Sequence, residues 1–132
     1  MATRERPLSP HLTVYRWQVQ MVGSILNRAT GIVLSLGALL IAWGLVALAA
    51  GPEAFADVVD VVRSPLGFIV LLGGVWSLSY HLLGGLRHLS QDAGYGYRIA
   101  TFVRTGWASI VGSLLLTAIV LGAAILAQRG AA

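Results

Sequence analysis

Residues 77–92 combine two histidines and two glycines inside and just beyond an apolar segment. If this segment is helical, four of its residues share one face at positions i, i+3, i+4 and i+7: His81, Gly84, Gly85 and His88. An ionisable side chain at hydrocarbon depth is costly, so His81 marks a functional-site hypothesis. The glycines leave bare surface beside its imidazole, as suits an axial ligand of haem iron. The alternative is a helix-packing patch, in which the glycines admit a neighbouring helix and His81 hydrogen-bonds across the gap.

A second polar face lies where the first apolar stretch begins, at Ser24, Asn27, Arg28 and Gly31. A quinone headgroup needs hydrogen-bond donors at its carbonyl oxygens, set in an otherwise apolar cleft. A serine hydroxyl and a guanidinium supply such donors, so Ser24 and Arg28 are candidate quinone contacts. The alternative is that Arg28 extends to the lipid headgroups, and residue type alone favours this alternative.

Arg87 and His88 follow the histidine at the polar end of the same segment. At 1.5 Å per residue, His81 lies roughly 9 Å deeper than Arg87. Arg87 and His88 therefore fall at the membrane interface, where they suit haem propionates or lipid phosphates.

The composition is that of a membrane protein, because 57% of the 132 residues are hydrophobic and 11% are charged. The chain has no cysteine, which excludes disulfides, cysteine-bound zinc and a cysteine-held iron–sulfur cluster within it. Three stretches lack Asp, Glu, Lys and Arg, and each exceeds the roughly 20 residues that cross a bilayer: Ala29–Pro52, Ser64–Leu86 and Thr105–Gln128. We therefore predict an all-α integral membrane protein with an arm at 1–23, a transmembrane domain at 24–132 and helices near 24–50, 64–89 and 103–128.

The predicted N-terminal arm is too polar to span and contains Pro7 and Pro10, which exclude a continuous helix. No apolar core follows the first arginines closely, so the arm is not a secretory signal. Tyr15 and Trp17 favour an arm that lies at headgroup depth or against a soluble partner. The alternative is a disordered cytoplasmic tail.

The net charge is +4, and all the basic side chains that carry a full positive charge are arginines. Their distribution predicts the orientation of the chain in the membrane, not nucleic-acid binding. Seven arginines lie on the side of the N-terminus and of the loop between the second and third helices, and two lie on the other: Arg4, Arg6, Arg16, Arg28, Arg87, Arg98 and Arg104 against Arg63 and Arg129. The N-terminus is therefore expected in the cytoplasm and the C-terminus outside, in a bacterial inner membrane or its mitochondrial equivalent.

A haem bound by two imidazoles would need a second chain. His81 and His88 are about 10.5 Å apart along one helix. Two axial nitrogens lie only about 4 Å apart if each metal–nitrogen bond is near 2 Å. One straight helix cannot supply both, so the second ligand is expected from a membrane partner.

Three motifs together resemble the cytochrome b membrane-anchor subunits of succinate dehydrogenase (respiratory complex II). Residues 6–15, RPLSPHLTVY, are close to that family's N-terminal signature. Residues 24–31, SILNRATG, resemble its Ser-Ile-x-His-Arg-x-Thr-Gly motif, and residues 81–92, HLLGGLRHLSQD, resemble its His-x-x-x-Gly-Ile-Arg-His-Leu-x-x-Asp motif. Order, spacing and the three-helix plan agree over nearly the whole chain.

The resemblance implies that His81 is an axial ligand of haem b and that Ser24 and Arg28 belong to a ubiquinone pocket beside the iron–sulfur subunit. Asn27 stands where the family usually has a histidine associated with the haem propionates. Asn27 can donate a hydrogen bond but carries no charge. Arg28, Arg87 or His88 are therefore expected to cover more of the propionate contacts.

The implied reaction is the oxidation of succinate at FAD in a flavoprotein subunit. Electrons then pass through iron–sulfur clusters of a second soluble subunit to quinone at the membrane surface. This chain would hold no succinate site. It would anchor the soluble subunits and share one haem b, within a common helical bundle, with a second small anchor subunit.

Two other functions compete with this interpretation. One is the anchor of a fumarate reductase, which runs the reverse reaction with quinol. The other is a cofactor-free membrane scaffold or assembly protein, for which His81 would be dispensable. A transporter is disfavoured, because the predicted helices show neither paired intramembrane charges nor a repeat.

Overall fold

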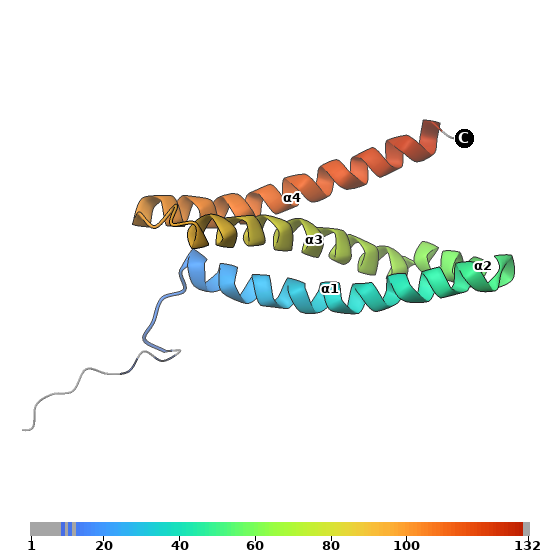
Figure 1. The fold of residues 1–132 in the computed structure, drawn as a ribbon, viewed down its shortest axis with the longest axis horizontal. Coiled ribbons are helices and arrows are strands. Elements are labelled where there is room, and N and C mark those ends of the chain that lie inside the picture. Colours follow the sequence, from blue (N-terminus) through green and yellow to red (C-terminus); the bar gives the residue numbers. More distant parts are fainter. Residues whose placement is uncertain (1–8, 10, 12, 131–132) are drawn as a thin grey trace, which may run out of the picture.

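The computed structural model describes residues 9, 11 and 13–130 and folds them into helices joined by short turns (Figure 1). The helices of this described part are α1 (Val19–Ala50), α2 (Pro52–Arg63), α3 (Pro65–Asp92) and α4 (Ile99–Gly130), with no strand among them. Three of them, α1, α3 and α4, are long and apolar enough to cross a membrane. The predicted all-α class with three transmembrane helices is confirmed.

The long helices extend past the charge-free stretches that predicted them. Helices α1 and α4 have 32 residues each and α3 has 28. At about 1.5 Å per residue they measure about 42–48 Å, against a hydrocarbon core of about 30 Å. A charge-free stretch marks only the part that must lie in hydrocarbon, whereas helical hydrogen bonding continues until the backbone is interrupted. Helix α1 therefore begins five residues before the predicted start at 24, and α4 four residues before 103.

The acidic connection after α1, where the sequence indicated an amphipathic turn, is the 12-residue helix α2. Gly51 allows the chain to reverse because its φ of +131° is rarely adopted by other residues. Pro52 then fits the first turn of α2. Val58 of α2 is buried against α1, where its Cγ1 lies 3.8 Å from the position of a Cβ on Gly44.

Helix α3 lies between α1 and α4, with its C-terminal end beside the N-terminal ends of both (Figure 1). Most buried positions hold small residues: Thr30, Ser77, Ser79, Gly84, Gly106, Ser109, Ser113 and Thr117. Small residues let helix backbones approach closely, as is common in membranes. The indole Nε1 of Trp76 adds a cross-helix bond, donating to Ser113 Oγ at 3.2 Å. The larger apolar side chains point outward, as expected of helices surrounded by lipid or other apolar helices.

Much of the predicted N-terminal arm lies outside the described residues, namely 1–8, 10 and 12. Residues 13–18 form a turn and an extended segment before α1. The rings of Tyr15 and Trp17 lie 5.5 Å apart between centroids, and Trp17 is 57% exposed. Trp17, with the partly buried Tyr15 beside it, therefore remains available to the interface or to a partner.

Candidate functional site

The imidazole of His81 projects from α3 onto the main chain of α1. Its Nδ1 lies 3.1 Å from the main-chain oxygen of Asn27. A carbonyl oxygen only accepts hydrogen bonds, so Nδ1 must carry the hydrogen. In the neutral ring, Nε2 is then the nitrogen with a free lone pair.

Thr30, one turn further along α1, completes the surroundings of this ring nitrogen. Thr30 is only 2% exposed, and its hydroxyl lies 2.8 Å from the Leu26 oxygen and 3.1 Å from the Asn27 oxygen. The hydroxyl proton is directed to these carbonyls, which leaves Oγ1 an acceptor 3.4 Å from His81 Nδ1. The ring therefore has two acceptors on one side and is held in one orientation.

Two glycines make this close approach of α1 and α3 possible. A Cβ on Gly31 would lie 3.2 Å from His81 Cε1, and one on Gly84 would lie 2.7 Å from Asn27 Oδ1. The helix-packing role considered for Gly84 therefore applies. Gly85, its neighbour, faces open space, since a Cβ there would meet nothing in the described residues within 4 Å.

The other ring nitrogen of His81 is available to a ligand. Nε2 makes no hydrogen bond to the part of the chain that the structure describes, and it is not among the buried unpaired atoms there. A neutral imidazole whose second nitrogen donates to a backbone carbonyl is the usual state of a metal-bound histidine. Within the described ranges no three His, Cys or acidic residues cluster to hold a free metal ion. The donor set is thus one locked imidazole beside open space at Gly85, which fits an axial haem ligand.

The polar face predicted on α1 is divided by the packing. Asn27 is half-buried against α3, and its Oδ1 is a buried atom that finds no hydrogen-bond partner in the described residues. Ser24 and Arg28 are exposed on the outer side of the same turns. The two predicted quinone contacts therefore stay together, one helical turn apart, while Asn27 belongs to the histidine site.

Arg87 and His88 separate in the same way. His88 is exposed, two turns from His81 on α3. Arg87 is directed to α4, where Nε donates to Thr105 Oγ1 at 3.2 Å and Cζ lies 4.3 Å from the centroid of the Phe102 ring. A propionate contact for Arg87 would require its guanidinium to leave both partners.

Two contributors to the histidine site were not predicted from the sequence. The Asn27 oxygen belongs to the main chain, so no residue type could indicate it. Thr30 was not predicted as a site residue, although it lies three residues after Asn27 and therefore on the same helix face.

The described fold and this site define a small three-span membrane protein with an orientated histidine between two of its helices. The chain belongs to the family of succinate dehydrogenase/fumarate reductase transmembrane subunits, whose model matches residues 2–120. The resemblance found in the motifs is confirmed, and with it the prediction that the chain is a membrane subunit of an enzyme complex.

Three relatives illustrate the breadth of the match. The succinate dehydrogenase cytochrome b556 subunit of Paracoccus denitrificans is 52% identical over 116 residues, which cover 88% of this chain and 89% of the relative. The cytochrome b556 subunit of Rickettsia conorii is 36% identical, with 86% and 88% covered. The mitochondrial cytochrome b560 subunit of Sus scrofa is 42% identical, with 76% and 61% covered.

Proposed function

We propose that the chain is the membrane anchor of a succinate:quinone oxidoreductase, in which it binds haem b jointly with a second anchor subunit and forms part of the ubiquinone-reduction site. The observation that carries the haem assignment is the hydrogen bond from His81 Nδ1 to the Asn27 oxygen. It leaves Nε2 with its lone pair free at an accessible position, which is what an iron ligand requires.

This chain's residues would divide the haem contacts among them. His81 Nε2 would hold the iron, while the Asn27 oxygen and Thr30 keep the ring from rotating. Bound haem supplies reversible one-electron transfer. Arg28 and His88 are exposed and are the first candidates for the propionates, whereas Arg87 must first leave Thr105 and Phe102.

Ser24 and Arg28 would bind the quinone as substrate. Their hydroxyl and guanidinium groups donate hydrogen bonds, and quinone carbonyl oxygens accept them. Reduction to quinol consumes two electrons, delivered by the iron–sulfur subunit, and two protons. Both side chains are exposed on the isolated chain, so the pocket would be closed by a partner subunit.

The family supports the proposed soluble partners. The relatives are named as succinate dehydrogenase subunits, which favours a complex with a flavoprotein and an iron–sulfur subunit over the fumarate reductase alternative. The clusters would reside in the iron–sulfur subunit, since this chain has no cysteine to hold them, and FAD in the flavoprotein. The second anchor subunit would supply the other haem ligand.

The first test is a reduced-minus-oxidised visible spectrum of the purified membrane complex, for wild type, His81→Ala and the control His11→Ala. We expect a b-type band in wild type and His11→Ala, and its loss or displacement in His81→Ala. No band in wild type would favour the cofactor-free scaffold. An unchanged band in His81→Ala would contradict the ligand assignment and make His88→Ala the next variant.

The quinone site is tested separately by comparing two electron acceptors. Ser24→Ala and Arg28→Gln should lower succinate-dependent quinone reduction at least tenfold, the loss expected when a bound carbonyl loses a donor. Reduction of a soluble dye by the flavoprotein should not change. Ser35→Ala is the matched control, because it is an exposed serine further along α1. Equal losses with both acceptors would indicate failed assembly instead of a quinone contact.

The orientation, with the N-terminus cytoplasmic and the C-terminus periplasmic in a bacterial inner membrane, can be tested with single cysteines. The natural chain has none, so each label is unambiguous. Ala56→Cys in α2 and Ala93→Cys after α3 are both exposed positions. In intact cells an impermeant thiol reagent should label Ala56→Cys and not Ala93→Cys. The opposite pattern would reverse the orientation.

A further inference from the structure

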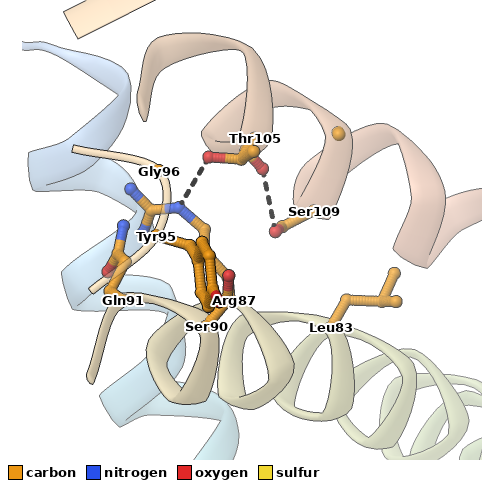
Figure 2. A pocket seen from close by; sticks show the side chains of 9 residues that line it. Leu83, Arg87, Ser90, Gln91, Tyr95, Gly96, Thr105 and Ser109 are labelled. Atoms are coloured by element: carbon orange, nitrogen blue, oxygen red, sulfur yellow. Dashed lines mark hydrogen bonds between the residues drawn. The ribbon is translucent and has the colours of Figure 1, made fainter. Parts of the chain in front are cut away.

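A cavity of about 210 Å³ lies between the C-terminal end of α3 and the first turns of α4 (Figure 2). Leu83 and Ala108 line its deeper part. Polar groups line the remainder, chiefly Arg87, Gln91 and Thr105. Tyr95 and Gly96 of the loop between the helices form its rim, and the φ of +84° at Gly96 is one that other residues rarely adopt.

Two hydrogen-bond donors on residues that line this cavity lack acceptors. Arg87 Nη2 and Gln91 Nε2 are buried and have no partner in the described part of the chain. Figure 2 shows both nitrogen-bearing groups at the same side of the cavity, with Arg87 held in place by its bond to Thr105. Buried polar groups are normally paired, so two orphaned donors at one cavity indicate a ligand that supplies acceptors.

The charge of the cavity indicates that this ligand is an anion. Arg87 carries a positive charge, and no carboxylate is among the residues that line the cavity. Its two described partners, a hydroxyl and an aromatic ring, do not neutralise it. A half-buried guanidinium without a counter-ion is costly, and phosphate oxygens suit its donors.

The depth of the cavity indicates the source of the anion. Arg87 directly follows the charge-free stretch of α3, and Thr105 begins that of α4. Leu83 and Ala108 lie about one turn inside these limits. The cavity therefore sits where hydrocarbon gives way to headgroups. At about 30 Å³ per water molecule it has room for about seven water-sized groups, which admits a phosphate and its nearest glycerol carbons.

We propose that the Arg87–Gln91 cavity binds the phosphate of a membrane phospholipid, with the glycerol end directed past Leu83 and Ala108 into the hydrocarbon. Arg98 is exposed beside the loop that forms its rim and favours an anionic headgroup. The site differs from the predicted propionate contact of Arg87 and needs no haem, so it does not rest on the proposed electron-transfer function.

The test is native mass spectrometry of the complex purified through a tag on this chain, delipidated and titrated with dioleoyl-phosphatidylglycerol. Wild type should bind one phospholipid. The dissociation constant of Arg87→Gln for this lipid should be at least tenfold higher, a loss of about 1.4 kcal/mol in binding free energy. Gln91→Glu replaces the amide with a carboxylate of the same shape, which removes the donor and adds a negative charge. It should weaken lipid binding comparably. Arg104→Gln is the matched control for general positive charge and should bind as wild type does.

Each remaining outcome decides the proposal. Retention of the phospholipid by both Arg87→Gln and Gln91→Glu overturns it, as does an equal loss in Arg104→Gln. Binding of inorganic phosphate at millimolar concentration, with no lipid bound to wild type, would overturn the lipid assignment and assign the cavity to free phosphate. Release of a soluble subunit from Arg87→Gln at unchanged lipid content would mean that a partner's carboxylate fills the site.

Discussion

The contact between Gly31 and His81 yields the sharpest prediction, because Gly31→Ala adds one methyl group at the ring. The new Cβ would lie 3.2 Å from Cε1, whereas carbon atoms rest about 3.5–4.0 Å apart. The ring must therefore withdraw from α1 by about 0.3–0.8 Å. Added to the present 3.1 Å between Nδ1 and the Asn27 oxygen, this gives about 3.4–3.9 Å, beyond the usual hydrogen-bond limit of about 3.2 Å.

Loss of that bond should affect haem binding more than folding. The bond contributes about 0.5–1.5 kcal/mol, which the higher helix propensity of alanine, about 1 kcal/mol, largely offsets. Outer partners of a metal-bound histidine commonly affect affinity about ten- to a hundredfold. We expect Gly31→Ala to keep its thermal stability within about 1 kcal/mol of wild type while its haem affinity falls by that factor.

The assay is haem per complex from the pyridine haemochrome, together with the haem midpoint potential and the Tm. Gly37→Ala is the control, since it makes the same change on α1 where a Cβ meets nothing in the described structure within 4 Å. It should keep the haem content and potential of wild type. Wild-type haem content and potential in Gly31→Ala would refute the claim that this contact sets the position of the ligand.

Three further predictions concern the surroundings of the site and the helix packing. Thr30→Val should displace the haem midpoint potential and Thr30→Ser should not, because only valine removes the hydroxyl beside the ligand ring; a redox titration compares them. A double-mutant cycle of Trp76→Phe and Ser113→Ala should give a coupling of about 0.6 kcal/mol in thermal unfolding, since the two share a hydrogen bond within the membrane, and zero coupling would contradict that bond. Gly67→Ala should lower the Tm of the complex by several degrees, because the added Cβ would overlap the main chain at the end of α2. Gly73→Ala is the control and should leave the Tm unchanged, because a Cβ there meets nothing in the described structure within 4 Å.

The three spans could be predicted because charge-free stretches longer than about 20 residues have few stable alternatives to a membrane helix. Their ends could not, since a helix may continue into the interface where charge gives no signal. Helix α2 was underestimated for a related reason. Its alternating acidic and apolar residues allow either a turn or a helix, and contact of Val58 with α1 selects the helix.

Helical periodicity grouped Asn27 with Ser24 and Arg28, because all three fall within one broad face of α1. It could not indicate that α3 covers only one edge of that face. The same limit applies to Arg87, which α4 draws away from the predicted propionate position by offering Thr105 and Phe102.

Residue types, their spacing and the charge pattern were sufficient for the all-α membrane class and the family, because these depend on chemistry and on positions along one chain. The state of the imidazole depends on something else. The Asn27 carbonyl that selects its tautomer, the glycines that let it come close, and the orphaned donors of the Arg87–Gln91 cavity all arise where two helices meet. Contacts between helices depend on how the helices pack, and no local pattern records them.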